Sequence, residues 1–298
     1  MPITRKIMGV SRGGVSKKAI FGYGTTGSAV SHTNLVNSSG VVASDVTGVG
    51  TARYLLAASS YGTDKAIFGY GSNGNGVSMT NLVNSSGVVA SDVTGVGTAR
   101  YGLAAASYGT DKAIFGYGFD ATYFSLTNLV SSSGVVASNV TGVGTARRYL
   151  AAASYGTDKA IFGYGGVPSN VSLTNLVSSA GVVASDVTGI GTARRNLAAA
   201  SYGTDKAIFG YGAVPSAVSL TNLVSSAGVV ASDVTGVGSV RDGLAAASYG
   251  TDKAIFGYGY NGNGVSMTNL VNSSGVVASD VTGVGTARWN LAASSYGN

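Results

Sequence analysis

Residues 18–24 read Lys-Ala-Ile-Phe-Gly-Tyr-Gly, and the identical phrase begins again at five later positions. The six copies follow one another at a constant interval of 47 residues, starting at Lys18, Lys65, Lys112, Lys159, Lys206 and Lys253. A fixed period of this length indicates an architecture in which each repeat is one supersecondary unit stacked on its neighbours. The chain is therefore predicted to fold as six equal units.

Each repeat predicts four short β-strands. In the copy that contains Lys206 we expect strands at residues 198–202, 206–212, 218–224 and 229–235. The intervening turns are rich in Gly, Asp and Ser, whereas the strand segments favour Val, Ile, Leu, Phe and Tyr. Four strands in about 40 to 50 residues are typical of one blade of a β-propeller. The sequence thus predicts an all-β fold, a six-bladed β-propeller of four-stranded antiparallel blades.

The two ends of the repeat region predict that the ring closes. The chain enters the repeat at Lys18, on the second strand of a blade, and stops after residues 291–296, which match a first strand. That last segment has no following Lys-Ala-Ile-Phe partner of its own. We expect it to pair with residues 18–24, because this pairing would leave no sheet edge open. The propeller domain would then span residues 18–298.

The composition excludes several other classes of protein. Charged residues make up 10% of the chain, Cys is absent and Gly occupies 47 positions, which favours short strands and tight turns and excludes disulfides and thiolate metal sites. The apolar residues lack the 3.6-residue period of a helical solenoid. No stretch approaches about 18 consecutive apolar residues, so no membrane span is expected. Residues 1–17 lack the apolar core of a secretory signal, so we expect synthesis in the cytoplasm without signal-directed export.

The positive charge is concentrated at the N-terminus. Of the 18 Lys and Arg, four lie in the first 17 residues, at Arg5, Lys6, Arg12 and Lys17, and the rest nearly balance the 12 acidic residues. The repeats carry no clustered basic residues, which argues against nucleic acid as a partner. We predict a basic arm over residues 1–17. It either docks on an acidic partner or is a solvated leader.

Residues 98–118 read Thr-Ala-Arg-Tyr-Gly-Leu-Ala-Ala-Ala-Ser-Tyr-Gly-Thr-Asp-Lys-Ala-Ile-Phe-Gly-Tyr-Gly, which resembles the kelch propeller motif. In that motif an Arg precedes an inner strand and the next strand ends in paired glycines. The likeness covers residues 18–298, but Gly116-Tyr117-Gly118 replaces the double glycine, and the spaced Tyr and Trp pair is missing. The resemblance implies kelch-like architecture and not kelch partners. Near-identical repeats of this kind are also similar to structural proteins of bacteriophages, which implies a virion component.

Two places in the repeat vary while the rest stays close to constant. They are the five-residue loops after Gly-Tyr-Gly (25–29, 72–76, 119–123, 166–170, 213–217 and 260–264) and the pair after the invariant Arg. In an antiparallel blade these two connections emerge at the same end, so both should lie on one face of the disc. Most of the aromatic residues outside the framework positions fall there. Since exposed Tyr and Trp suit binding surfaces, we predict a binding face made of Tyr54, Asn73, Asn75, Tyr101, Phe119, Asp120, Tyr123, Tyr149, Tyr260, Asn261, Asn263 and Trp289.

An alternative is that the sequences of these loops vary without any functional constraint. Phe124 is assigned to packing, because it replaces a strand Val of the other copies.

Other polar residues are assigned structural roles. His32, the only His, stands where other copies have Met or Leu, which indicates a tolerated strand substitution. The Asp of Ser-Asp-Val-Thr becomes Asn139 in one copy, so it is expected to act through hydrogen bonds and not as a calcium ligand. The invariant arginines could line the channel or one rim and attract an anion. The favoured interpretation is a salt bridge or carbonyl cap inside every blade.

The repeat also argues against catalysis. Acid–base chemistry needs one titratable group in a unique environment, and six equivalent positions cannot single out one Asp. The glycine triplets do not open a helix, so they are not phosphate-binding loops, and no cofactor or metal is expected. The leading prediction is a non-catalytic ring, present in one or several copies in a phage-like virion, that decorates a head or tail or attaches a fibre to other virion proteins. The alternative is a lectin-like or receptor-binding propeller that recognises a glycan or a cell surface, such as a cell-surface glycan, through the variable aromatic loops.

Overall fold

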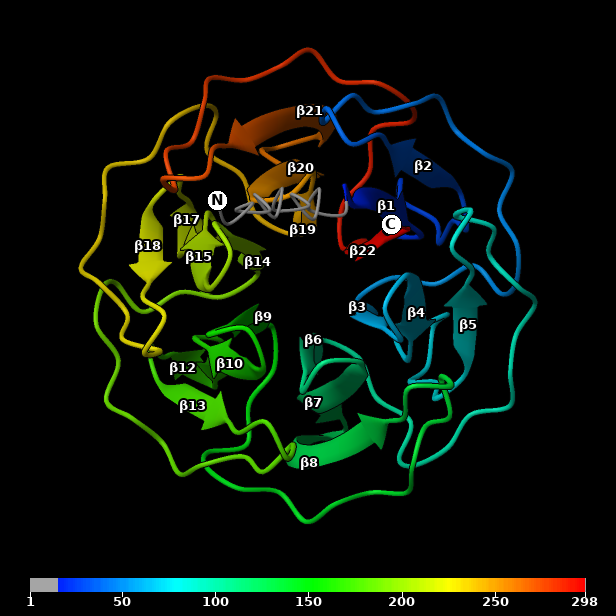
Figure 1. The fold of residues 1–298 in the computed structure, drawn as a ribbon, viewed down its shortest axis with the longest axis vertical. Coiled ribbons are helices and arrows are strands. Elements are labelled where there is room, and N and C mark those ends of the chain that lie inside the picture. Colours follow the sequence, from blue (N-terminus) through cyan, green and yellow to red (C-terminus); the bar gives the residue numbers. More distant parts are fainter. Residues whose placement is uncertain (1–15, 298) are drawn as a thin grey trace, which may run out of the picture.

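The structure is a computed structural model that describes residues 16–297, and this part contains strands and turns but no helix. Hence none of these residues form a helix that could cross a membrane. Figure 1 shows six three-stranded sheets arranged around a central axis. All strand pairs are antiparallel, and the chain is a propeller-like ring of repeated sheets. We number the sheets as modules 1 to 6 in chain order.

Each module has an inner, a middle and an outer strand (Figure 1). The inner strands are, from module 1 to module 6, β22 (Ala292–Tyr296), β3 (Ala57–Tyr61), β6 (Ala104–Tyr108), β9 (Ala151–Tyr155), β14 (Ala198–Tyr202) and β19 (Ala245–Tyr249). The middle strands are β1 (Lys18–Gly22), β4 (Lys65–Gly69), β7 (Lys112–Asp120), β10 (Lys159–Gly163), β15 (Lys206–Gly210) and β20 (Lys253–Tyr260). The outer strands are β2 (Thr33–Val36), β5 (Thr80–Val83), β8 (Thr122–Val130), β13 (Thr174–Val177), β18 (Thr221–Val224) and β21 (Gly264–Val271).

The modules differ in the hairpin that joins the middle strand to the outer strand. In modules 3 and 6 this hairpin is long, because β7 and β8 have nine residues each and β20 and β21 have eight. Modules 4 and 5 carry separate two-residue strands at the same place, β11 (Gly166–Val167) with β12 (Ser169–Asn170) and β16 (Ala213–Val214) with β17 (Ser216–Ala217). The variable loops are therefore the ends of these hairpins.

The C-terminal strand pairs with the first repeat, as expected. β22 is antiparallel to β1, with Lys18 opposite Tyr296 and Gly22 opposite Ala292. The same register joins β3 to β4 in module 2, where Tyr61 lies opposite Lys65. Module 1 is therefore assembled from the two ends of the chain. Lys17, assigned by sequence to the basic arm, belongs to the ring, because it exchanges two backbone hydrogen bonds of 2.8 and 2.9 Å with Gly250. Residues 1–15 of the predicted arm lie outside the described residues.

Backbone hydrogen bonds circle the axis at both ends of the ring. At one end six residues each donate an N–H to the equivalent carbonyl of the previous module over 2.6–2.9 Å, namely Leu55, Gly102, Tyr149, Asn196, Gly243 and Asn290. All six have φ between 53° and 64°, the left-handed region that costs Leu and Tyr more than Gly or Asn. At the other end six glycine N–H groups each reach the turn of another module over 2.7–2.8 Å, from Gly62, Gly109, Gly156, Gly203, Gly250 and Gly297.

The predicted fourth strand is not regular. In module 1 it is reduced to two isolated bridges to β2, Val36 with Val42 and Thr33 with Val46, and the outer segment uses one more residue than β2 between them. The extra residue makes a bulge, where Nδ2 of Asn34 donates a hydrogen bond of 3.0 Å to the carbonyl of Ala43. The prediction of four regular strands per blade was therefore wrong in detail, because a side chain replaces part of the backbone ladder.

The apolar core lies between the modules. Ile20 and Tyr23 of module 1 cluster with Leu56 and Phe68 of module 2, and the junction between modules 6 and 1 buries an equivalent set. The ring of Phe68 packs so closely on Gly22 that a Cβ there would lie 2.7 Å from it, which explains why the position is Gly in every copy. Both faces of each sheet are covered by neighbours, so no module has a core of its own.

We predict that a chain ending at Asn290 loses at least about 10 °C of thermal midpoint, because it lacks the β22–β1 pairing and exposes the faces of modules 2 and 6. Differential scanning calorimetry measures the change. Addition of a peptide of residues 291–298 should restore part of the midpoint. An unchanged midpoint in the shortened chain would show that the terminal pairing does not hold the ring.

Candidate functional site

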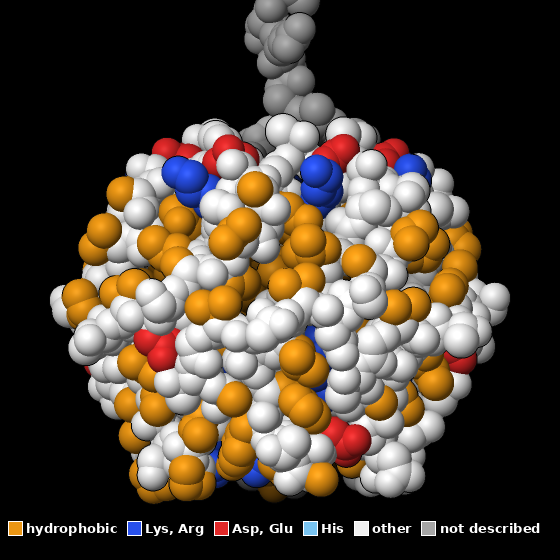
Figure 2. All heavy atoms as spheres, turned by 90° about the horizontal axis from the view of Figure 1, so that it is seen from below, with side chains coloured by type: hydrophobic (Ala, Val, Ile, Leu, Met, Phe, Trp, Pro, Cys, Tyr) orange, Lys and Arg blue, Asp and Glu red, His pale blue; other side chains and the backbone are white. Residues whose placement is uncertain are grey.

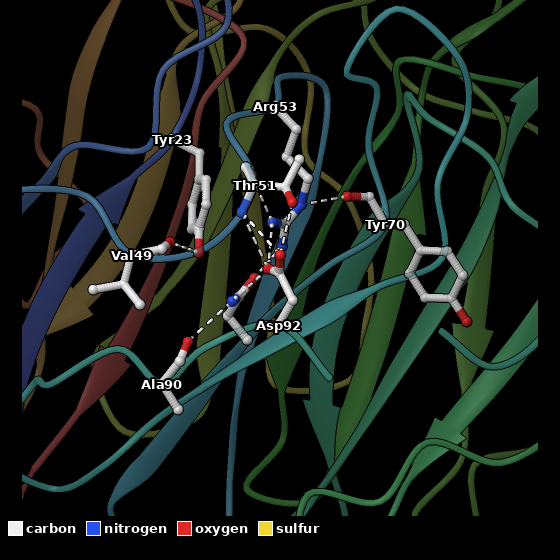
Figure 3. Close-up of polar contacts among 8 residues, drawn as sticks. Tyr23, Val49, Thr51, Arg53, Tyr70, Ala90 and Asp92 are labelled. Carbon is white, nitrogen blue, oxygen red and sulfur yellow. Dashed lines mark hydrogen bonds and ion pairs between the residues drawn. The ribbon is translucent and has the colours of Figure 1, made fainter. Parts of the chain in front are cut away.

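An arginine without solvent contact lies at each junction between modules. Arg53 donates hydrogen bonds to the carbonyls of Tyr70 (2.8 Å) and Thr51 (3.1 Å) and to Oδ1 of Asn81 (2.6 Å). Its guanidinium carbon lies 4.4 Å from the ring centroid of Tyr23, which belongs to module 1 (Figure 3). The same contacts recur at Arg100, Arg147, Arg194, Arg241 and Arg288. The favoured interpretation as a carbonyl cap is confirmed, and the alternative of an anion-binding rim is not, because these groups are buried.

An acidic residue next to each arginine forms hydrogen bonds with the chain segment that connects two modules. Asp92 accepts hydrogen bonds from the N–H and Oγ1 of Thr51 over 3.0 and 2.7 Å, and its Oδ1 lies 3.8 Å from Arg53 (Figure 3). Asn139 takes the same place in module 3, where it accepts from the N–H of Thr98 and donates to its Oγ1. The expectation that this position acts through hydrogen bonds is confirmed, because Asp92 and Asn139 make equivalent contacts to the Thr.

The junction shifts the pKa of its titratable groups. Desolvation raises the pKa of Tyr23 to about 12, against the opposing charge of Arg53. At Asp92 desolvation also acts to raise the pKa, but hydrogen bonds from Thr51 and Asn81 and the charge of Arg53 outweigh it and lower the pKa. The equivalent carboxyls Asp45, Asp186, Asp233 and Asp280 are lowered in the same way.

Replacement of Arg194 by Ala is predicted to lower the free energy of unfolding by about 3 kcal/mol or more, because Asn222 and the carbonyl of Tyr211 lose their buried partner. Chemical denaturation measures the effect. The adjacent Arg195→Ala is the matched control, since this side chain makes no such bonds, and it should change the free energy by no more than about 0.5 kcal/mol. Equal effects of the two substitutions would contradict a structural role for Arg194.

The junction also predicts an acid-sensitive stability. Because the pKa of the five carboxyls is below its ordinary value of 3.8, their stabilisation is complete above that value and is lost as pH falls through the lower folded pKa. We expect the urea midpoint to fall steeply below about pH 4. A variant with Asn at all five positions, copying Asn139, should show a flatter profile. The same steep profile in both proteins would assign the acid sensitivity to other groups.

The structure places both variable regions at one end of the ring, as predicted. In every module the first residue of the variable pair bridges to the first residue of a variable loop, for example Tyr54 to Ser72, Tyr101 to Phe119 and Asp242 to Tyr260. The second residue of the pair is the one that takes part in the axial hydrogen-bonded circle. We call this end the variable face.

One group of predicted residues comes together at the junction of modules 3 and 4. The ring centroid of Phe119 lies 5.7 Å from that of Tyr101 and 5.1 Å from that of Tyr123, in edge-to-face contacts. The guanidinium carbon of Arg148 lies 4.3 Å from the ring of Phe119 and 4.7 Å from the ring of Tyr149. All five side chains are partly exposed. We call this set the Arg148 cluster.

A second pair forms at the junction of modules 6 and 1. The rings of Tyr260 and Trp289 lie 5.1 Å apart, and Tyr260 is 38% exposed. Since the inner strands contact one another in ring order, this junction lies three modules away from the Arg148 cluster, on the opposite side of the axis. The face therefore carries two separated aromatic sites.

The other predicted residues stand apart from these two sites. Asn73 and Asn75 are exposed at the loop tip of module 2, and Asn261 and Asn263 are exposed at that of module 6. Tyr54 is partly exposed, and no aromatic contact joins it to either site within residues 16–297. Asp120 is exposed at the tip of β7 and lies against Gly76 of module 2.

Sequence reasoning included Asp120 but missed three other charged residues of the face. Arg148, Arg195 and Asp242 occupy the first position of the variable pair, where other modules have Tyr or Trp. Desolvation raises the pKa of Asp242, while Asn196 and Arg195 act to lower it. The alignment of the six copies already marked these positions as variable. The selection kept the aromatic residues of the variable pairs together with several loop residues, and left these three out.

The opposite end of the ring is repetitive and polar. Figure 2 shows acidic and basic side chains gathered around one end, which matches the Thr-Asp-Lys turn of each repeat. A cavity of about 630 Å³ opens there, with Ser60, Ser107, Ser154 and the equivalent serines in its wall. Residues 16–297 contain no group of three or more side chains placed to hold a metal ion.

His32 lies just before β2, partly buried, and Phe124 lies within β8. The Nδ1 atom of His32 has no hydrogen-bond partner among the described residues. Its carbonyl accepts the N–H of Tyr23, which any residue type could do, as expected of a tolerated substitution. Neither residue belongs to the variable face.

Comparison with known proteins assigns no family. No family model matches the chain, and no curated protein matches it.

Proposed function

We propose that this chain is a six-bladed, kelch-like β-propeller that acts as a non-catalytic binding ring in a phage-like virion. In this proposal each module is one blade, with an irregular outer segment in place of a fourth strand. The ring attaches to other virion proteins, or carries a fibre, through the variable face. No cofactor is part of the proposal.

The observation that carries the proposal is the concentration of sequence variation at one end of a nearly constant framework. Every junction repeats the same buried arginine, tyrosine and asparagine, so the framework offers each blade the same support. The variable residues are backed by backbone bridges and by the axial hydrogen-bonded circle. A rigid scaffold with adaptable loops at one end is a common arrangement for recognition.

We propose no catalytic activity, because the titratable groups of the ring are not placed to act together on one substrate. The carboxyls at the junctions are equivalent by repetition and already accept hydrogen bonds from Thr or Ser. On the variable face, Asp120 and Asp242 are anchored in different modules and contact different partners. An acid and base pair acting on one substrate would need to converge.

Glycan recognition is the second candidate function, and the two aromatic sites favour it. The Arg148 cluster and the Tyr260–Trp289 pair each offer partly exposed rings beside hydrogen-bonding groups. Rings of this kind provide a large contact area with little loss of side-chain entropy. A virion ring could use such sites to contact a cell surface.

Triple replacement of Phe119, Tyr260 and Trp289 by Ala is predicted to weaken binding by at least about tenfold, because each removed ring contributes contact area at the centre of a site. A glycan array and co-sedimentation with purified particles measure the two kinds of partner. A matched control carries Val41→Ala, Val88→Ala and Val135→Ala on the outer segments, away from the variable face. If the aromatic variant binds particles and glycans as well as the wild type, the variable face is not the binding site.

A further inference from the structure

The guanidinium of Arg148 is held in place by aromatic rings but has no hydrogen-bond partner. Its central carbon lies 4.3, 4.7 and 5.6 Å from the ring centroids of Phe119, Tyr149 and Tyr123. Within residues 16–297 none of its N–H groups donates a hydrogen bond, and no carboxylate lies within 4.0 Å of it. By contrast, the buried neighbour Arg147 uses its N–H groups on three acceptors.

The other charged groups of the variable face do not compensate Arg148. Asp242 accepts a hydrogen bond of 3.4 Å from Asn196, and the charge of Arg195 acts on it. This carboxyl therefore belongs to the junction of modules 5 and 6 and not to the Arg148 cluster. Asp120 projects from the tip of β7 toward Gly76 of module 2. Arg195 also acts on Tyr149, but the carboxyl of Asp242 lies under its charge, whereas no carboxylate of the described residues is paired with Arg148. Arg148 is therefore the cation of the cluster that keeps unpaired N–H groups and an aromatic surround.

We propose that the Arg148 cluster is a subsite for the carboxylate of an acidic sugar. The proposal rests on the glycan-binding function and names the class of glycan. The N–H groups of the guanidinium bond the planar carboxylate in a forked arrangement, and Tyr101 and Tyr123 contact the adjacent sugar ring.

The charge of the site favours a sugar over a polyanionic partner. Nucleic acids and strongly acidic peptides gain affinity from several cations that act together, and the cluster offers one. A uronic acid residue carries one carboxylate on a ring with an apolar face and several hydroxyls. That combination matches one guanidinium bordered by the partly exposed rings of Phe119, Tyr123 and Tyr149, since the two Tyr rings also carry a hydroxyl.

Isothermal titration calorimetry with methyl galacturonide, which carries one carboxylate, with its methyl ester and with the carboxyl-reduced methyl galactoside tests the subsite. The wild-type protein should bind the acid at least about tenfold more tightly than either neutral form, as expected for loss of a charged hydrogen-bond pair. Arg148→Gln should abolish this preference, and Arg148→Lys should restore part of it. Lys159→Gln, which makes the same change in charge at the start of β10, should keep the full preference.

The possible outcomes separate the subsite from the wider function. Equal affinity for acid and ester, or an unchanged preference in Arg148→Gln, overturns the subsite while glycan binding stands. No binding to any saccharide on an array overturns the glycan-binding function itself. Binding of a polyglutamate peptide that depends on Arg148, without saccharide binding, would assign the cluster to an acidic protein partner and overturn the proposal. Thermal midpoints of the variants confirm that each one is folded.

Discussion

A fully buried guanidinium group at every junction is the constraint on which the rest of the ring depends. An unpaired charge in this environment would be very costly, so each of these arginines needs its full set of acceptors. The acceptors come from different places: a carbonyl after the middle strand, a carbonyl of the connecting segment and an Asn of the outer strand, with a Tyr ring of the previous module alongside. A change at the arginine disturbs both the module that holds its acceptors and the Tyr ring of the previous module, which accounts for the same Arg, Asn and Tyr in all six copies.

The buried arginines do not restrict which side chains occur on the variable face. Its side chains stand at hairpin ends and beside the axial circle, where backbone bonds fix the main chain whatever the side chain is. Differences among the modules can therefore accumulate there without loss of the core. Two long hairpins on opposite sides of the axis, in modules 3 and 6, contribute Phe119 and Tyr260 to the aromatic ring pairs of the variable face.

Arginine has two physical roles in this molecule, although Arg147 and Arg148 are adjacent in sequence. Arg147 points into the junction, where hydrogen bonds and the ring of Tyr117 enclose it. Arg148 points to the variable face, where aromatic rings orient it and leave its N–H groups unused. The alternation of side chains about an extended backbone decides which of the two is structural.

The sequence by itself determined the all-β class, the six equal units, the pairing of the last strand with Lys18–Gly22 and the single variable end, because an exact repeat imposes the same local structure six times. It also marked Phe119, Tyr260 and Trp289 as members of that end. Only the tertiary structure decided that Asn34 interrupts the outer strand with its side chain, that the arginines stack on a tyrosine of the previous module, and that Arg148 joins Phe119 and Tyr149. These contacts join residues from different strands and modules, and spacing along one chain carries no information about which side chains meet across a junction.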